Sequence, residues 1–316
     1  MLDQLALAGL IPVIKVNDAQ DAVPLCKALQ DGGLPVAEIT FRTAAAEEAI
    51  RLVHEQVPDV LLGAGTVLTP EQADRAWAAG AQYIVSPGFN PRVVKHCLDK
   101  GYPILPGCSS PSDIEQALEM GLTAVKIFPA GALGGIATIK ALAGPYPQMH
   151  YVPTGGVNAN NLMDYLNFPK VLACGGSWMV PQDAVDAKDW GKIKALAAQA
   201  VDLMLGFNIV HIGINNPDAQ AAKTAADRLS QLFHWPIKEG TNYFVGTGIE
   251  LMKAPGRGTH GHVAIGTPNV ERAKWHLEKR GFAFDDSTAR RGADGKLTFI
   301  YVQDEMAGFA FHLIQK

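Results

Sequence analysis

The sequence predicts an α/β protein with two domains: a (β/α)8 TIM barrel, followed by a smaller α+β domain of two βαβββ modules. The chain has 316 residues, which exceeds the ~100–200 residues of a typical single domain. Residues 1–205 alternate strand-like and helix-like runs, a pattern typical of a parallel sheet. Residues 206–316 contain a faint internal repeat, in which one arrangement of strands and a helix occurs twice.

Composition narrows the functional classes. Hydrophobic residues make up 48% of the chain and the formal charge is −4, which argues against a nucleic-acid partner because such proteins usually carry a basic domain. The four cysteines form no C-x-x-C pair, as expected for reduced thiols. No signal peptide and no apolar run long enough for a membrane span is recognisable. We therefore expect a soluble cytoplasmic protein with neither nucleic-acid nor membrane partners.

Eight strands are expected in the first domain, each a short apolar run: 11–16, 36–40, 60–64, 83–86, 103–105, 124–127, 151–153 and 171–174. The helices expected between and around them are 2–8, 18–30, 44–56, 70–79, 91–100, 112–119, 136–141, 160–166 and 183–205. Proline near the start of 70–79 costs little there, and Gly80 ends that helix. A doubly wound open sheet is the alternative, but residues 16–22 lack the glycines of a dinucleotide-binding turn.

Polar and glycine-rich residues follow the predicted strands, at the end where barrel enzymes carry their chemistry. These positions are Glu38, Thr40, Arg42, 63–66, 86–88, 106–109, Lys126, 154–156 and 175–177. The last two ranges contain Gly-Gly pairs after the seventh and eighth strands, where backbone N–H groups often bind phosphate. One such pair alone would indicate only a tight turn, whereas two favour a phosphate site.

Three charged residues are candidates for catalysis. Lys126 lies among Val125, Ile127 and Phe128, where poor solvation favours a neutral amine that can attack a carbonyl; alternatively its head reaches water. Glu38 is either a general acid/base or an outward-facing residue paired with a helix. Arg42 either clamps a substrate carboxylate or is an ordinary loop arginine. Spacing alone leaves both readings open for Glu38 and Arg42.

Six stretches of the first domain occur together in one order: 36–43 (VAEITFRT), 63–68 (GAGTVL), 85–88 (VSPG), 126–130 (KIFPA), 153–157 (PTGGV) and 175–178 (GGSW). Through them residues 1–205 resemble the bacterial 2-keto-3-deoxy-6-phosphogluconate (KDPG) / 4-hydroxy-2-oxoglutarate aldolase family. The resemblance implies a TIM barrel, class I Schiff-base chemistry and a homo-oligomer, a trimer being favoured. It also implies that a phosphorylated 2-keto sugar acid is cleaved to pyruvate and glyceraldehyde 3-phosphate. The alternative substrates are 4-hydroxy-2-oxoglutarate and the phosphogalactonate epimer.

The resemblance also implies roles for single residues. Lys126 matches the Schiff-base lysine and Glu38 the general acid/base. Substrate-binding positions are matched by Arg42, Thr66, Pro87 and Thr154, and the phosphate pocket by Gly155, Gly156, Gly176 and Ser177. Gly131 stands where many members carry an acidic residue, which affects only finer substrate contacts. No metal cofactor is expected for this domain, because its only histidines are His54, His96 and His150, and the first two fall in predicted helices.

The second domain, 206–316, holds six of the nine histidines. Its repeat places 210–214 (VHIGI) against 261–265 (GHVAI), each followed by a proline and a helix, 217–233 and 268–280. The halves end in 249–253 (IELMK) and 311–315 (FHLIQ). The domain therefore resembles the glyoxalase, or vicinal-oxygen-chelate, superfamily.

That resemblance implies a divalent metal between the modules. Its ligand positions are matched by His211, Glu250, His262 and His312, the last a histidine where a glutamate is common. His260 is a competitor for His262 but does not align with His211. Three roles stay open for this domain: a metal-dependent enzyme, a regulatory module that binds a small molecule, and a structural or assembly module whose metal site has decayed.

Overall fold

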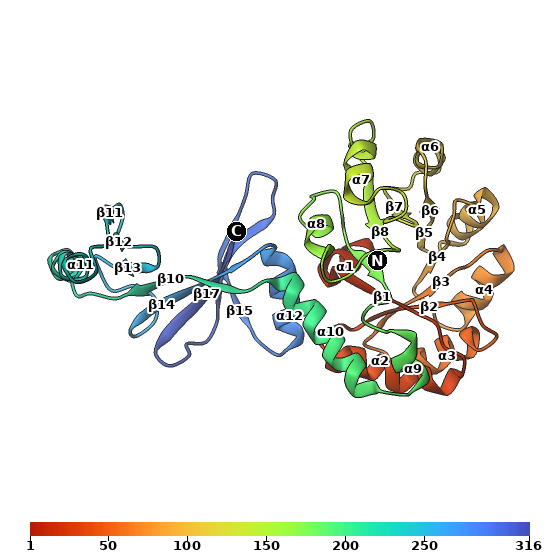
Figure 1. Cartoon of the computed structure of the whole chain (residues 1–316), viewed down its shortest axis with the longest axis horizontal. Helices are drawn as coiled ribbons and strands as arrows, with labels where there is room; N and C mark the ends of the chain where they lie inside the picture. The colour runs from red at the N-terminus through yellow and green to blue at the C-terminus, as the bar shows by residue number, and fades with distance from the viewer. The chain divides into compact units, whose positions relative to one another are not determined.

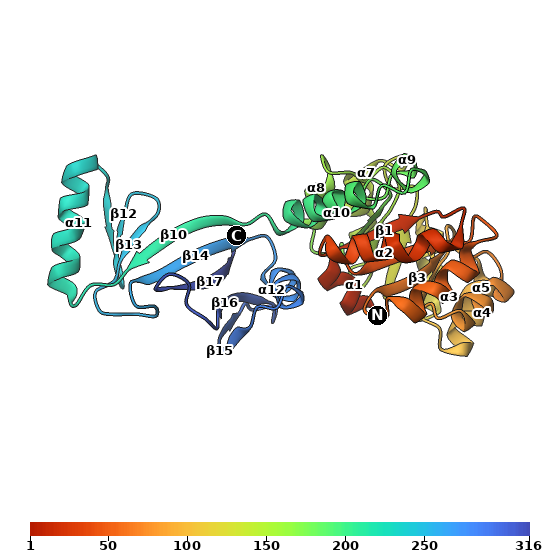
Figure 2. The same cartoon turned by 90° about the horizontal axis from the view of Figure 1, so that it is seen from below.

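The computed structural model describes residues 1–316. The chain forms two compact units, Met1–Met204 and Leu205–Lys316, each with its own sheet and core (Figures 1 and 2). No helix combines the length and the apolar character needed to cross a bilayer.

Unit 1 is a ring of parallel strands surrounded by helices (Figure 1). One sheet has the order β5-β4-β3-β2-β1-β9 and another the order β6-β7-β8. A bridge between Thr154 and Gly175 connects β8 to β9, and β5 and β6 are separated only by Pro106. The strands are β1 (Leu10–Ile14), β2 (Val36–Thr40), β3 (Leu61–Gly65), β4 (Tyr83–Val85), β5 (Ile104–Leu105), β6 (Gly107–Cys108), β7 (Ala124–Ile127), β8 (His150–Pro153) and β9 (Cys174–Gly176).

Local sequence signals set the starts of three helices in this unit. Thr69, Asn90 and Ser110 each precede a proline and accept a hydrogen bond from a backbone N–H of the first turn, as good N-caps do. The helical segments are α1 (Leu2–Ala8), η1 (Ala19–Asp21), α2 (Ala22–Asp31), α3 (Ala46–Gln56), α4 (Pro70–Ala78), α5 (Pro91–Lys100), α6 (Pro111–Glu119), α7 (Gly135–Ala143), α8 (Leu162–Leu166), α9 (Gln182–Asp186) and α10 (Trp190–Leu205).

Two expected elements of this unit are placed differently. The eighth strand is Cys174–Gly176, because the glycines pair with Leu10, Ile11 and Pro12 of β1; of the expected strand 171–174, Val171 makes only an isolated bridge to Tyr151. The closing helix expected over 183–205 is two helices, α9 and α10, separated at Lys188, whose φ of 54° is left-handed.

Unit 2 contains two modules with the expected order of one strand, one helix and three strands. The first is β10 (Asn208–Ile214), α11 (Ala219–Phe233), β11 (Ile237–Glu239), β12 (Tyr243–Val245) and β13 (Ile249–Leu251). The second is β14 (Gly261–Thr267), α12 (Val270–Lys279), β15 (Phe284–Arg291), β16 (Leu297–Val302) and β17 (Phe309–Gln315). Antiparallel pairing of β10 with β14 joins them into one sheet of order β11-β12-β13-β10-β14-β17-β16-β15.

The two faces of this sheet differ in character. On the face that we call the helix face, α11 covers β12 and β13 around Ala222, Tyr243 and Leu251, and α12 packs against β16 and β17 (Figure 2). Residues alternate between faces along a strand, so Glu250 and His312 lie on the opposite face. We call that opposite face the histidine face.

Candidate active site and candidate metal centre

The interior of the barrel in unit 1 contains one buried ion pair. Lys126 Nζ of β7 lies 3.1 Å from Glu38 Oε1 of β2, and the two residues are 5% and 2% exposed. The Phe128 ring centroid is 5.6 Å from the Lys126 amine. Burying either charge alone would be costly, so each stabilises the other in the barrel. A nucleophilic amine and an acid/base carboxylate therefore lie within one hydrogen bond of each other.

Two glycines of β3 make room for the side chains of Glu38 and Tyr83. A Cβ on Gly65 would lie 2.3 Å from Glu38 Oε1, and a Cβ on Gly63 would overlap the Tyr83 ring. Tyr83 is fully buried, and burial together with the negative charge of Glu38 raises its pKa well above the usual value. Sequence reasoning missed Gly65 and Tyr83 as determinants of the site, because their effect depends on contacts across the barrel.

Polar residues predicted to bind substrate follow β2, β3 and β4. The Arg42 Nε donates a hydrogen bond of 3.0 Å to Thr40 Oγ1, whose hydroxyl donates in turn to the Ile14 carbonyl at 2.8 Å. Thr40 therefore orients the otherwise exposed Arg42 side chain. Thr66, directly after β3, has a φ of 57°, an unfavourable conformation for a β-branched residue. Pro87 is half-buried just beyond β4.

The first predicted phosphate loop follows β8. Gly155 and Gly156 have φ values of 86° and 83°, which glycine adopts without strain. Their carbonyls accept hydrogen bonds at 2.8 Å from the Gly131 N–H and at 2.9 Å from Asn161 Nδ2. The side chain that Gly131 lacks would lie 3.2 Å from the Gly156 Cα. Gly131 is therefore part of the packing of this loop.

The second predicted phosphate segment consists of the last two residues of β9, Gly175 and Gly176, and of Ser177, which follows the strand. A Cβ on Gly175 would lie 2.4 Å from Thr154 Oγ1, and one on Gly176 would overlap the Trp178 ring. Ser177 is exposed at the end of this strand. The bridge between Thr154 and Gly175 brings the two Gly-Gly segments together.

Comparison with known proteins identifies the family of this unit. The model of the KDPG and KHG aldolase family matches residues 2–196. The chain belongs to this family. It is 52% identical over 204 residues to the 2-dehydro-3-deoxy-phosphogluconate aldolase of Treponema pallidum (strain Nichols), covering 65% of this chain and 97% of that protein. It is 42% identical over 198 residues to the KHG/KDPG aldolase of Escherichia coli (strain K12), covering 63% and 93%.

Solved structures agree with this assignment. The KDPG aldolase of Legionella pneumophila, with pyruvate captured at low pH as a covalent carbinolamine, is 40% identical with a TM-score of 0.62 and covers 63% of this chain and 98% of its own. The Zymomonas mobilis ZM4 aldolase with 3-phosphoglycerate is 39% identical with a TM-score of 0.60, covering 63% and 94%. The chain is thus an aldolase, a carbon–carbon lyase, with the family's β/α barrel as unit 1. In this aldolase unit, His54 and His96 lie on helices and His150 begins β8.

The four ligand positions predicted in unit 2 come together on the histidine face. The ligand atoms of His211, His262 and His312 lie within 4.8 Å of one another. The Oε2 of Glu250 is 3.3 Å from His211 Nε2 and 3.2 Å from His262 Nε2. Strands β10 and β13 of one module and β14 and β17 of the other each supply one residue. Three imidazoles and one carboxylate form a donor set suited to a divalent transition metal.

The environment of these residues fits a metal. The Nδ1 of His312 is buried without a hydrogen-bond partner, which is unfavourable for a polar atom with no ligand to bind. Asn242 Nδ2 donates to Glu250 Oε1 at 2.7 Å, as outer-shell groups do for ligating carboxylates. A Cβ on Gly213 would lie 2.1 Å from the His262 ring, so this glycine makes room for the imidazole. Sequence reasoning missed Asn242 and Gly213.

The pKa shifts of Glu250 and His312 favour the protonation states that bind a metal. Burial raises the pKa of Glu250, but hydrogen bonds from His211, His262 and Asn242 outweigh it and hold that pKa well below the usual value. Burial, together with the neighbouring charges of His262 and His211, lowers the pKa of His312 to about 4. An ionised carboxylate and a neutral imidazole are the forms that bind metals.

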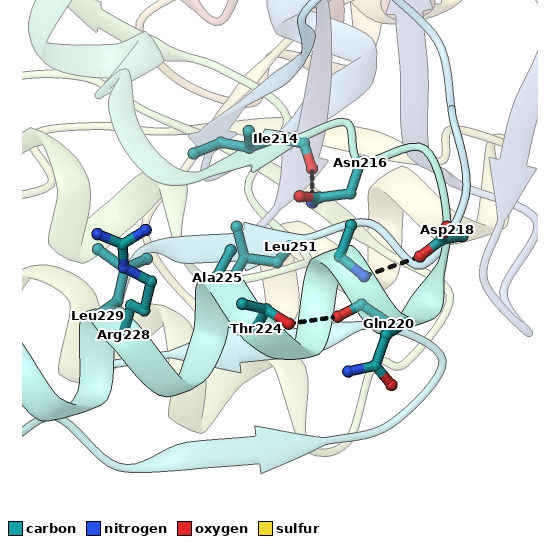
Figure 3. A pocket seen from close by; sticks show the side chains of 10 residues that line it. Ile214, Asn216, Asp218, Gln220, Thr224, Ala225, Arg228, Leu229 and Leu251 are labelled. Atoms are coloured by element: carbon teal, nitrogen blue, oxygen red, sulfur yellow. Dashed lines mark hydrogen bonds between the residues drawn. The ribbon is translucent and has the colours of Figure 1, made fainter.

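Two other features of unit 2 lie apart from this cluster. His260 is exposed near Phe309, at a ring-centroid distance of 5.7 Å, and does not join the three histidines. A groove of about 710 Å³ runs between α11 and the sheet (Figure 3). Ile214 and Leu251 line it from the helix face, and Asp218 at one end is engaged in capping α11 through the Ala221 N–H. The groove contains no pair of groups suited to catalysis.

Proposed function

We propose that the aldolase unit cleaves 2-dehydro-3-deoxy-6-phosphogluconate to pyruvate and glyceraldehyde 3-phosphate through a Schiff base on Lys126. The observation that carries this proposal is the 3.1 Å contact between Lys126 Nζ and Glu38 Oε1 inside the barrel. Family membership and the two adjoining Gly-Gly segments, which offer backbone N–H groups to a phosphate, support it.

The neutral Lys126 amine adds to the C2 carbonyl, and the carbinolamine loses water to give an iminium ion. Glu38 accepts the proton of the C4 hydroxyl, directly or through one water. The electrons of the C3–C4 bond then flow to the iminium, which releases glyceraldehyde 3-phosphate and leaves an enamine. Protonation at C3 and hydrolysis of the resulting iminium release pyruvate and regenerate the amine. The iminium is the electron sink, so this scheme requires no metal.

The other predicted residues bind the substrate in this scheme. Arg42, Thr66, Pro87 and Thr154 surround the pyruvyl carboxylate and the hydroxyl groups, with Arg42 held in place by Thr40. Gly155, Gly156, Gly176 and Ser177 bind the phosphate. Kinetics with 4-hydroxy-2-oxoglutarate and the phosphogalactonate epimer, followed as pyruvate release, test the choice of substrate; a higher kcat/KM for either would replace the one proposed.

Borohydride reduction in the presence of pyruvate tests the chemistry. We expect a pyruvyl adduct on Lys126, detected by peptide mass spectrometry and absent in Lys126→Ala. Lys140, a lysine of α7 outside the barrel interior, is the matched control, and Lys140→Ala should give the same adduct as the unchanged chain. A folded protein that gives no adduct on Lys126 would refute the Schiff-base assignment.

We further propose that unit 2 binds a divalent metal through His211, Glu250, His262 and His312. The observation that favours this second function is the convergence of all four side chains from four strands on one face. A bound ion of this kind supplies Lewis-acid chemistry toward an oxygen ligand. The protein residues hold the ion and, through Asn242, keep the Glu250 carboxylate in position.

Metal content tests this function. The full chain, stripped with chelator and reloaded with Zn²⁺, should retain about one equivalent by elemental analysis, in keeping with a single four-ligand site. His262→Ala should abolish retention and His260→Ala should not. Equal zinc contents in the two variants would contradict the site and leave a structural or assembly role for unit 2.

A further inference from the structure

Two arginines of the histidine face, Arg290 and Arg257, stack on the aromatic rings of Phe299 and Tyr301. We call these four residues the wall of that face. The Arg290 Cζ lies 4.6 Å from the Phe299 ring centroid, and the Arg257 Cζ lies 5.0 Å from that of Tyr301. Arg290 is paired with Phe299 across β15 and β16, so the two share a face. These are cation–π contacts, which favour positions of the guanidinium groups over the ring faces.

The same rings contact the histidine cluster. Phe299 and Tyr301 lie 4.4 and 4.9 Å from the His312 ring, centroid to centroid. Each arginine is therefore separated from the metal-binding cluster by the width of one aromatic ring.

The two arginines differ in whether an acidic side chain neutralises their charge. Arg257 pairs with Asp285 at 2.8 Å, whereas Arg290 makes no ion pair. An imidazole that binds a metal adds no charge, so the single carboxylate of this donor set would leave a divalent ion with one net positive charge, because the fourth ligand is His312 rather than a second carboxylate. Arg290 and the metal would therefore be two separate positive centres on the histidine face, with the Phe299 ring in contact with both Arg290 and His312.

We infer that the histidine face binds a small organic acid with two anionic groups, one on the metal and the other on Arg290, with Arg257 assisting. This inference rests on the metal site proposed above. An acid with a single anionic group cannot reach both centres, because an aromatic ring separates them. The aromatic rings of Phe299 and Tyr301 would contact the carbon chain of the ligand, as apolar walls do in small-molecule sites.

Cobalt absorption spectroscopy on the full chain tests the inference. The background is Lys126→Ala, which prevents Schiff-base formation with 2-oxo acids. The visible bands of bound Co²⁺ report only on the metal site, and they are followed during titration with 2-oxoglutarate, which has two anionic groups, and with pyruvate, which has one. We expect 2-oxoglutarate to bind at least about tenfold more tightly than pyruvate, because a hydrogen bond to a charged group is worth about 1.5–3 kcal/mol.

Arginine variants identify the residues responsible. Arg290→Met should weaken 2-oxoglutarate binding about tenfold, to the level of pyruvate, while leaving pyruvate binding and the Co²⁺ bands unchanged; Arg290→Lys should restore part of the loss. Arg228→Met, on α11, removes an arginine from the other face and should have no effect. Equal affinities for the two acids, or no effect of Arg290→Met, would overturn the inference alone. Absence of Co²⁺ bands that depend on His312 would overturn the metal site and the inference with it.

Discussion

At the scale of single residues, the buried pair of Lys126 and Glu38 shows which parts of a site can be predicted from the sequence. An isolated lysine in an apolar strand was recognisable as a candidate, and so was Glu38. The direction of the Glu38 side chain was not, because all five residues of β2 are buried and no alternation distinguishes inside from outside. The space that admits Glu38 comes from Gly65 on the neighbouring strand, a contact that no local pattern encodes.

Substitution of Gly65 by alanine should separate the catalytic contact from the fold. The new Cβ would lie 2.3 Å from Glu38 Oε1, so Glu38 must move away from the Lys126 amine. We expect kcat to fall by about 100-fold, since a displacement near 1 Å has an effect of this order. The measurement is steady-state pyruvate release, with thermal unfolding as the check on folding. Gly144→Ala, at the end of α7, is the control, and equal activity in the two variants would argue against a role for the Glu38 position.

At the scale of elements, the starts of three helices could be predicted from the sequence. The position of the eighth strand and the division of the closing helix into α9 and α10 could not. Cap and proline signals before α4, α5 and α6 act over a few residues, so the sequence contains them in full. The eighth strand is decided by pairing of Cys174–Gly176 with β1, a long-range choice that outweighs the apolar appearance of 171–174. Two arginines near the histidine cluster escaped prediction because long-range contacts place them there: Arg290 through the pairing of β15 with β16, and Arg257 through its contacts with Tyr301 and Asp285.

The capping box of α6 should have a measurable effect on stability. Ser110 Oγ accepts from the Asp113 N–H, and the Asp113 carboxylate accepts from the Ser110 N–H. Ser110→Ala should lower the free energy of unfolding by about 1 kcal/mol. Ser112→Ala, two residues further on in the first turn of α6, should have a much smaller effect. Denaturant titration of both variants measures the difference. Identical midpoints would show that the cap adds nothing to the stability of the aldolase unit.

The close contact between Gly213 of β10 and the His262 ring allows a second test at this scale, of the metal site. Gly213 has no Cβ because the His262 ring occupies that space. Gly213→Ala should displace the imidazole and weaken zinc binding about 10–100-fold, as changes around metal ligands typically do. Competition with a chromophoric chelator gives the affinity. Gly240→Ala is the control, because its Cβ would meet nothing closer than 3.9 Å, and it should bind zinc as the unchanged chain does. If Gly213→Ala also bound zinc with unchanged affinity, the proposed site would be wrong.

At the scale of the whole molecule, the two units have separate cores, and each contains its own candidate site. The aldolase unit was predictable because its motifs are numerous and occur in a fixed order. Unit 2 was predictable as two repeated modules, since the repeat itself is in the sequence. The ligand inferred for it depends on the three-dimensional placement of Arg290 and Phe299. Assembly into a homotrimer stays a prediction, which light scattering on the purified chain can test against the 33.7 kDa monomer mass.

Metal should stabilise one unit selectively. A ligand that binds only the folded state stabilises it by about 2.7 kcal/mol at a hundredfold excess over Kd, and every proposed zinc ligand lies in Leu205–Lys316. Calorimetry of the full chain should therefore show two transitions, of which zinc raises one and leaves the other in place. The transition that Ser110→Ala lowers should be the one that zinc does not raise. A zinc-dependent rise in both transitions would contradict a site confined to unit 2.

The pairing of β10 with β14 has a consequence for the history of the chain. Each copy of the repeated module contributes two of the four proposed ligands, so the proposed site needs both copies. If one copy lost a ligand, the ligands of the other copy could no longer complete the site. Selection for metal binding would therefore act on both copies together. The helices α11 and α12 supply none of the proposed ligands, so this constraint does not act on them, and they differ in length, with 15 and 10 residues.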